Sequence, residues 1–317
     1  MLVRDADSIR LAMLGMVEGN GHPFSWSAII NGEYDDSLMA QCGYPTISEY
    51  LGAQPRSALG IPGARVTHVW CDDANDAQRV ARAAHIPRVV ADPKEVIGEV
   101  DAVIVATDIG HEHIERVTPF IDAGLPVFID KPLTDRADHL ATFVDWVRGG
   151  AALMSTSCMR YAEEYRSLHN RMAGIGELRL ITVTMAKRWE RYGIHAIEAA
   201  YPFLRPGGYE AVRHSGNDMR NIIHIVHADQ ADCVLAVVND LYGAFGCVTL
   251  YGTEGQDRAV FTDTFNAFKA QLEAFIHYLR TGVCPVPFGE TIEQMKILIA
   301  GLRSREQGGA LIHLSTM

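Results

Sequence analysis

The sequence has no apolar run long enough to cross a membrane. A spanning helix needs about 20 consecutive apolar residues, and no stretch of the 317 residues approaches that length. The first residues include Asp5 and Asp7 and lead directly into a strand pattern, so they resemble neither a secretory signal nor a transit peptide. We therefore expect a globular, cytoplasmic protein with no membrane partner.

Clustered positive charge is also missing. The chain has 28 Lys and Arg against 39 Asp and Glu, a formal net charge of −11 at pH 7, and no Lys/Arg-rich block. Proteins that bind nucleic acids neutralise phosphates with grouped cations. Nucleic acid is therefore not an expected partner.

Metal-ligand spacing is absent as well. The cysteines form no CxxC pair, which favours reduced thiols. His111 and His113 form one dense histidine group, and His224 and His227 form another, but residues 224 and 227 would lie on opposite faces of a strand. No metal is expected. The scattered cysteines are Cys42, Cys71, Cys158, Cys233, Cys247 and Cys284.

Short strand patterns alternate with helical patterns in the first half of the chain. Apolar residues make up 48% and charged residues 21%, an ordinary globular balance, and 317 residues suggest two domains. We expect an N-terminal dinucleotide-binding domain at 1–157, a Rossmann-type doubly wound parallel sheet. Its strands are expected at 10–14, 66–70, 88–91, 101–107, 126–129 and 151–155.

Residues 158–317 have a different pattern. Residues 178–185 alternate like a strand of a sheet with one exposed face, and further strands are expected at 221–227, 233–238, 246–252 and 258–261. Helices are expected at 161–172, 265–280 and 292–303, the last with Thr291 and Gln294 in capping-box spacing. The prediction is an α+β domain on an open, mostly antiparallel sheet that serves substrate binding and oligomerisation.

A glycine turn, Gly15-Met-Val-Glu-Gly-Asn-Gly-His22, joins the first strand to a helix opened by Pro23. Such a turn lets the backbone approach a pyrophosphate at a helix N-terminus. The spacing departs from GxGxxG, because Val17 and Asn20 stand at the second and third glycine positions and Glu18 adds a carboxylate. Either Glu18 points away, toward substrate or a ribose hydroxyl, or dinucleotide binding is weakened or lost. The candidate cofactor residues here are Gly15, Glu18, Gly19, Asn20, Gly21 and His22.

Two acids, Asp72 and Asp73, follow the second strand. An acid at this place accepts hydrogen bonds from the adenosine ribose and repels a 2′-phosphate, which favours NAD over NADP. Asp72 is the better candidate. An Asp pair here is also a common N-cap of the following helix, expected at 75–84.

The stretch Phe128-Ile-Asp-Lys-Pro-Leu-Thr-Asp135 follows a buried strand and places Lys131 at a strand's carboxyl end, where α/β sheets bind ligands. It resembles the Glu-Lys-Pro signature of the glucose-fructose oxidoreductase, inositol dehydrogenase and rhizopine catabolism (Gfo/Idh/MocA) family, with Asp130 in the glutamate position. Thr107, His113 and Ala123-Gly124 resemble the pattern that precedes this signature.

Gly193-Ile-His195-Ala-Ile-Glu198 is similar to the family's second signature. On a helix His195 and Glu198 share a face, so the carboxylate would orient the imidazole of a histidine base. The family's Asp four residues before the His is Arg191 here. Either Glu190 turns in to replace it, or Arg191 binds a substrate carboxylate, which favours a sugar acid over a neutral polyol.

The resemblance covers nearly the whole chain, with the glycine turn and an insertion at about 33–64 as its poorest parts. It implies NAD-dependent hydride transfer between nicotinamide and a secondary alcohol of a sugar, inositol or sugar acid, in a homodimer or homotetramer. Lys131 and His195 would be catalytic, and Arg160 and Tyr161 would contact substrate. The implied cofactor contacts also include Thr107, Asp108, His113, Asp130, Lys131 and Pro132.

Two other functions remain open for the same fold. One is a regulatory protein that binds cofactor and sugar without turnover. The other is an enzyme that uses transient NAD oxidation to cleave a glycoside. Fold analogy alone does not separate them from a dehydrogenase.

Overall fold

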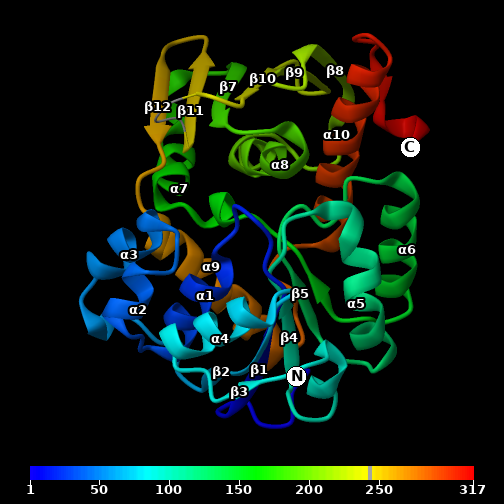
Figure 1. Ribbon diagram of the computed structural model, residues 1–317. Coiled ribbons are helices and arrows are strands. Elements are labelled where there is room, and N and C mark those ends of the chain that lie inside the picture. Colours follow the sequence, from blue (N-terminus) through cyan, green and yellow to red (C-terminus); the bar gives the residue numbers. More distant parts are fainter. Residues whose placement is uncertain (242–244) are drawn as a thin grey trace. The chain divides into compact units, whose positions relative to one another are not determined.

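The computed structural model describes residues 1–241 and 245–317 and divides the chain into two compact units (Figure 1). The N-terminal unit comprises residues 1–130, 143–155 and 268–286, and the C-terminal unit comprises 131–142, 156–267 and 287–317. The chain passes between the units several times, after residues 130, 142, 155, 267 and 286. A single boundary at 157 does not describe two segments. Residues 131–142 belong to the C-terminal unit, and residues 268–286 belong to the N-terminal unit.

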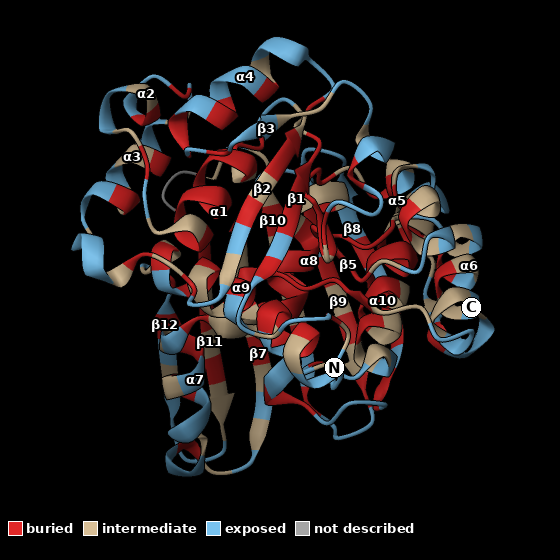
Figure 2. Cartoon of the chain, turned by 90° about the horizontal axis from the view of Figure 1, so that it is seen from below, coloured by how far each residue is buried: buried red, intermediate tan, exposed pale blue. Residues whose placement is uncertain are grey.

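The N-terminal unit contains the predicted parallel sheet, with strand order β3-β2-β1-β4-β5-β6. This is the strand order of doubly wound dinucleotide-binding domains. Successive strands are added in one direction from β1 to β3 and in the opposite direction from β4 to β6. Both central strands are buried because helices cover both faces of such a sheet, and Figure 2 shows β1 in red along most of its length. The strands are β1 (Ile9–Leu14), β2 (Ala64–Trp70), β3 (Arg88–Val89), β4 (Ala102–Val105), β5 (Val127–Ile129) and β6 (Leu153–Met154).

The helices of the N-terminal unit differ in how far they are covered. In α4, Ala77 and Val80 are buried while the outer face is exposed, pale blue in Figure 2. In α1, all residues from Pro23 to Ile30 are buried. The helices are α1 (His22–Asn31), α4 (Ala74–Ala83), α5 (His113–Asp122), α6 (Ala137–Arg148) and α9 (Thr264–Thr281), of which α6 and α9 also extend into the C-terminal unit.

Aromatic contacts explain why α9 returns to the N-terminal unit. The rings of Trp26 and Phe268 lie 5.9 Å apart, and those of Phe128 and Phe275 lie 5.4 Å apart. Two aromatic side chains of α9 thus pack on α1 and β5, and aromatic burial of this kind contributes strongly to a core.

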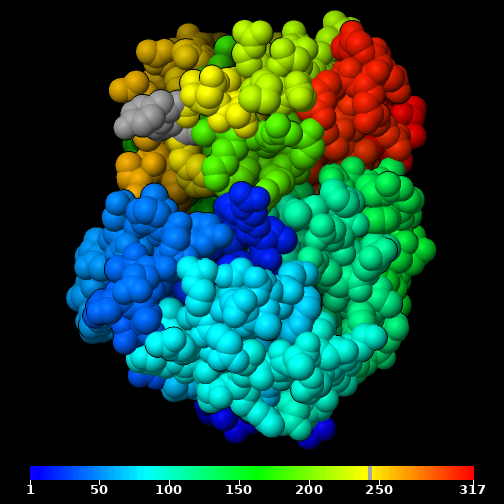
Figure 3. All heavy atoms as spheres, in the orientation of Figure 1, coloured from blue at the N-terminus to red at the C-terminus, as the bar shows by residue number. Residues whose placement is uncertain are grey.

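The insertion folds into α2 (Asp36–Ala40), α3 (Pro45–Gly52) and the 3₁₀ helix η1 (Arg56–Ala58). Asp35 caps α2 by accepting a hydrogen bond from the Leu38 amide at 2.9 Å. A Cβ added to Gly21 would lie 2.6 Å from Tyr44 and 2.7 Å from Ile47, so the insertion packs directly on the start of α1. Its side chains form part of the N-terminal unit's surface, in blue in Figure 3.

The C-terminal unit contains the second predicted sheet, of seven strands in the order β12-β11-β7-β10-β9-β8-β13. Every neighbouring pair is antiparallel except β7 and β10, which are parallel. The predicted hairpin is present as β9 and β10, whereas β8 and β13 were not predicted. The strands are β7 (Leu178–Ala186), β8 (Tyr209–Asn217), β9 (Arg220–His227), β10 (Asp232–Val238), β11 (Phe245–Gly252), β12 (Gln256–Val260) and β13 (Ile312–His313).

Helices α8 (Trp189–Ala200) and α10 (Phe288–Glu306) cover one face of this sheet (Figure 1), and α7 (Glu163–Asn170) packs beside β12. The predicted capping box at Thr291 and Gln294 is wrong. The helix starts four residues earlier than expected, after Pro287, so both side chains lie inside it and are buried.

The remaining helical segments are single 3₁₀ turns. They are η2 (Pro93–Val96), η3 (Gly110–Glu112), η4 (Cys158–Tyr161), η5 (Met172–Ile175), η6 (Tyr201–Phe203) and η7 (Leu314–Thr316). Within the described residues, no helix combines the length and the apolar character needed to cross a membrane.

The indole of Trp189 fills the space between α8 and α10, and two glycines of α10 provide a test of that packing. Trp189 is fully buried, and its Nε1 donates to the Leu298 carbonyl at 3.0 Å. A Cβ on Gly301 would lie 2.7 Å from that Nε1, whereas a Cβ on Gly289 meets no atom within 4 Å. We expect Gly301→Ala to lower the free energy of unfolding by about 1–3 kcal/mol through overpacking. Gly289→Ala should raise it by about 0.5–1 kcal/mol through helix propensity. Urea denaturation measures both, and equal effects would contradict this packing.

Candidate active site

The glycine turn lies at the point where the strand order reverses. Gly15 and Gly19 have φ of +84° and +81°, in the left-handed region that glycine adopts without a steric penalty. A Cβ on Gly15 would lie 2.7 Å from Cγ2 of Thr107, so the ends of β1 and β4 approach closely. Ligands of open α/β sheets bind at this edge.

Asn20, at the third glycine position, turns its side chain into the protein. It is 3% exposed, and its Nδ2 donates to Asp130 Oδ2 at 3.0 Å and to the Ala106 carbonyl at 3.2 Å. Its Oδ1 accepts from the His22 amide at 2.9 Å. The asparagine therefore joins the turn to the ends of β4 and β5, while Glu18 is exposed at the tip of the turn.

His22 makes a second bond from the turn to the strand that carries the lysine signature. Its Nδ1 lies 2.7 Å from Asp130 Oδ2, and its ring stacks on Trp26 at 4.3 Å. Asp130 is fully buried, and a buried carboxylate requires polar partners. Asn20 and His22 provide them, which fixes the residue directly before Lys131.

The two acids after β2 have separate roles. Asp73 is the N-cap of α4 and accepts from the Asn75 amide at 2.8 Å. Asp72 pairs with Arg116 at 2.9 Å, and its Oδ2 lies 3.8 Å from a Cβ placed on Gly15. Asp72 is thus the acid that lies beside the glycine turn.

A cavity of about 140 Å³ adjoins this turn, and its lining includes Gly15, Trp70, Lys94, Arg116 and Phe120. Sequence reasoning did not single out the last four. Trp70 and Phe120 are apolar faces suited to an adenine ring, and Lys94 and Arg116 are cations suited to phosphate. The sequence signal that could have found them is the aromatic residue at the end of β2 together with the cationic and aromatic residues of η2 and α5.

Thr107 and His113 were expected near the cofactor. Both are fully buried, and His113 Nε2 lies 2.9 Å from the Thr107 carbonyl oxygen, so the histidine holds the end of β4. The Thr107 hydroxyl has no hydrogen-bond partner among the described residues. A buried hydroxyl without a partner, beside a glycine turn, fits a ligand that supplies one. Asp108, the next residue, is also buried.

In the C-terminal unit, Lys131 and His195 are arranged around Tyr192, a residue that sequence reasoning did not single out. Lys131 is 2% exposed, and its Nζ lies 5.0 Å from the centre of the Tyr192 ring. The His195 ring lies 5.1 Å from the same ring, and Phe245 packs at 5.5 Å from His195. The two predicted catalytic residues therefore share one aromatic neighbour.

Ser157 holds the imidazole of His195. Its Oγ lies 2.7 Å from His195 Nδ1 and accepts from the Met159 amide at 3.1 Å. The Ser157 amide in turn donates to Glu198 Oε1 at 3.2 Å. The sequence predicted that Glu198 orients His195 directly; these bonds orient it through Ser157 instead.

Arg160 is the counter-ion of two carboxylates. Its Nε donates to Glu198 at 2.6 Å and its Nη1 to Glu290 at 2.8 Å. Burial acts to lower the pKa of Arg160, but the two carboxylates outweigh it and raise that pKa. The sequence predicted a substrate contact for Arg160 and Tyr161; the bonds of Arg160 describe an internal ion pair. Tyr161 lies beside it in η4.

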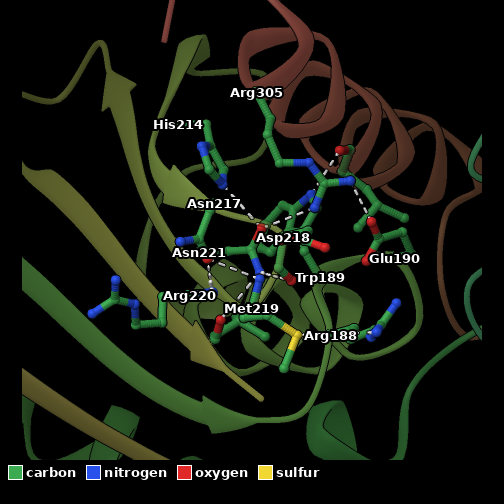
Figure 4. Close-up of polar contacts among 12 residues, drawn as sticks. Arg188, Trp189, Glu190, His214, Asn217, Asp218, Met219, Arg220, Asn221 and Arg305 are labelled. Atoms are coloured by element: carbon green, nitrogen blue, oxygen red, sulfur yellow. Dashed lines mark hydrogen bonds and ion pairs between the residues drawn. The ribbon is translucent and has the colours of Figure 1, made fainter. Parts of the chain in front are cut away.

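Glu190 does not take the place of the family's aspartate. Its side chain forms an ion pair with Arg305 of α10, which also donates to Asn221 Oδ1 at 3.2 Å (Figure 4). His214 Nε2 lies 2.9 Å from the same oxygen. This network draws Glu190 toward α10, so the alternative in which Glu190 turns in toward His195 is wrong. Arg191, the next residue, is half-buried in α8.

The doubly wound sheet with a glycine turn at its switch point is the architecture of dinucleotide-binding domains, and it is followed here by an α+β domain. In the described part of the chain, no group of three or more His, Cys, Asp or Glu side chains is placed to hold a metal ion.

Comparison with known proteins finds relatives for about a third of the sequence. The model of the Gfo/Idh/MocA oxidoreductase family, NAD-binding Rossmann fold, matches residues 42–154. Inositol 2-dehydrogenase 4 of Saccharopolyspora erythraea is 36% identical over 117 residues, 34% of this chain and 34% of that protein. The matched segment thus spans about a third of this curated relative, and β1 and the glycine turn lie outside the family match.

Solved structures are similar over the full chain. Myo-inositol 2-dehydrogenase from Lactobacillus plantarum has a TM-score of 0.74 at 16% identity, covering 96% of this chain and 99% of that one. GenD2 from gentamicin A biosynthesis, in complex with NAD, has a TM-score of 0.72 at 17% identity, covering 97% and 96%. These likenesses show the fold. Residues 42–154 are thus similar to the Gfo/Idh/MocA oxidoreductase family, and the chain as a whole shares the fold of these solved structures.

Proposed function

We propose that this chain is an NAD-dependent dehydrogenase that acts on a secondary alcohol of a sugar, inositol or sugar acid. The observation that supports this most is the grouping of Lys131 and His195 around Tyr192, with Asp130, the residue before Lys131, bonded to the glycine turn of a dinucleotide-binding sheet. The inositol dehydrogenase relatives and the NAD complex of a protein with the same fold support the chemistry.

The N-terminal unit provides the residues that would hold the dinucleotide. The backbone of the turn at Gly15 and Gly19 would take the pyrophosphate, and Asp72 the adenosine ribose. Thr107, with its hydroxyl lacking a partner, would contribute a hydrogen bond. When bound, the nicotinamide accepts or donates the hydride.

Proton transfer belongs to the C-terminal unit. The ammonium of Lys131 would donate a hydrogen bond to the reacting oxygen and stabilise the negative charge that develops there. His195 acts as a base when its Nδ1–H donates to Ser157 Oγ, because its Nε2 lone pair then accepts the substrate's proton. A hydroxyl at Ser157 rotates to serve either tautomer, which suits a reaction that runs in both directions.

We further propose that the chain forms a homodimer or homotetramer through the sheet face opposite α8 and α10. Alternate residues of its strands are partly exposed and apolar, including Leu180, Val234 and Ile222, the last 37% exposed. Partly exposed apolar side chains on one face of a sheet are a feature of interaction surfaces.

Light scattering after size-exclusion chromatography tests the oligomer. The unaltered protein should elute as a dimer or tetramer. Ile222→Asp places a charge in the proposed interface and should give monomers. Val283→Asp changes another exposed apolar residue, 67% exposed in the N-terminal unit, and should leave the oligomer intact. A monomeric unaltered protein would contradict the proposal.

Lys131→Ala tests the catalytic assignment. We expect turnover to fall by about 10²- to 10⁴-fold, the usual contribution of a positioned acid–base group. Binding of NADH, followed by fluorescence titration, should change little. Lys296→Ala, a half-buried lysine of α10, is the control and should keep full activity. Retained turnover in Lys131→Ala would remove the assigned role.

Asp72→Asn and Asp73→Asn test the choice of cofactor. Unaltered protein should bind NADH about 10-fold or more tightly than NADPH, because Asp72 bonds the ribose and repels a 2′-phosphate. Asp72→Asn should reduce that ratio. Asp73→Asn should leave it unchanged, because Asn also serves as an N-cap. Calorimetric titration measures both, and tighter binding of NADPH by the unaltered protein would overturn the preference.

A further inference from the structure

Lys187 has a backbone conformation that lysine seldom adopts. With Arg188 it forms the connection between the last residue of β7 and the first residue of α8, and its φ is +72°. Residues other than glycine rarely adopt this left-handed backbone conformation, because their Cβ atom comes too close to the following carbonyl oxygen. Such residues persist where the surrounding structure holds them, and they concentrate at functional sites.

The ammonium of Lys187 is held at the group formed by Lys131, Tyr192 and His195. Its Nζ donates to the Tyr192 hydroxyl at 2.6 Å and lies 4.3 Å from the ring centre. Tyr192 is the ring that contacts both predicted catalytic residues. Lys187 itself is exposed, so its ammonium lies on the solvent side of this group.

In the described residues, Lys187 forms no ion pair with a carboxylate. Among the described residues, the contacts of its ammonium are with Tyr192 alone. Glu190, the acid nearest in sequence, is paired with Arg305. A neutral polyol would leave this charge without a counter-charge, whereas a carboxylate would supply one.

The donors around Lys187 suit a carboxylate. A lysine ammonium has three N–H donors, and one of them is used on Tyr192. The Tyr192 oxygen accepts that bond, which leaves its own O–H as a donor. Two donors side by side match the two oxygens of a carboxylate.

We propose that the substrate is a hydroxy acid whose carboxylate is bound by Lys187 and Tyr192, which makes Lys187 a residue that determines specificity. This rests on the proposed function, because Lys131 and His195 mark the reacting end of the same substrate. The carboxylate then fixes which hydroxyl of the acid reaches His195.

Matched pairs of acid and neutral compounds test the proposal: D-gluconate with D-glucitol, D-glucuronate with D-glucose, and D-galacturonate with D-galactose. With NAD present, an acid should have a kcat/KM at least about 10-fold above its neutral partner. Lys187→Met should raise the KM for the acid by about 10- to 100-fold, the strength of one charge-assisted bond, with kcat nearly unchanged. The KM for the neutral partner should rise by less than the KM for the acid, because the neutral compound has no carboxylate for Lys187 to bind.

Two further variants separate charge from folding. Lys187→Arg keeps the charge and should restore part of the affinity for the acid. Lys187→Asn suits the left-handed backbone, so it should fold at least as well as the unaltered protein while losing the acid preference. Calorimetric binding of the acid to Lys131→Ala protein, with and without Lys187→Met, measures recognition without turnover.

The outcomes distinguish this proposal from the proposed function. Failure to bind NADH would remove the dehydrogenase assignment itself. The carboxylate site is overturned if NADH binds but no acid does, if neutral partners are preferred, or if Lys187→Met weakens acid and neutral compounds equally.

Discussion

The buried carboxylate of Asp130 is the constraint on which the glycine turn and the lysine signature both depend. An isolated ionised carboxylate inside a protein is strongly unfavourable, and Asp130 is fully buried. Asn20 and His22 lie at 3.0 Å and 2.7 Å from the same oxygen, and both come from the turn. The unusual turn and the shorter acid before Lys131 are therefore parts of one arrangement. A standard third glycine in place of Asn20 would leave Asp130 with one donor fewer.

Sequence patterns predicted the parts of the fold that are determined locally. The strands of the parallel sheet are apolar and are separated by glycine and helical signals, so their order along the chain follows from periodicity. Periodicity does not predict that α9 returns to the N-terminal unit. That return depends on contacts of Phe268 with Trp26 and of Phe275 with Phe128, and these partners lie far away in the sequence. Strand β8 was missed because its sequence does not alternate strictly: Ala211 and Val212 are both buried, and the pairing with β9 shifts in register after Tyr209.

In the candidate site, too, some residues could be identified from local sequence and others could not. Lys131 and His195 stand in recognisable signatures, so the sequence singled them out, and their catalytic role stays a prediction. Ser157 has no signature, and it lies 38 residues from the histidine that it orients. Spacing alone suggested that Glu198 would bond His195. The charge of Arg160 holds one carboxylate oxygen at 2.6 Å, and the Ser157 amide binds the other at 3.2 Å. Which groups bind the buried carboxylate of Glu198 depends on residues that are distant in sequence, and the spacing of residues along a helix does not reveal them.

Local charge in the C-terminal unit is set by how its acids are paired rather than by the net charge of −11. Glu198 and Glu290 are both bound by Arg160, and Glu190 is bound by Arg305. These pairs keep carboxylates in fixed positions on α8 and α10. Lys187 is left with a phenol as its partner. An acidic protein can thus present a positive charge beside Tyr192 and the proposed catalytic residues, because an ion pair between buried groups contributes little field at a distance compared with a single ammonium.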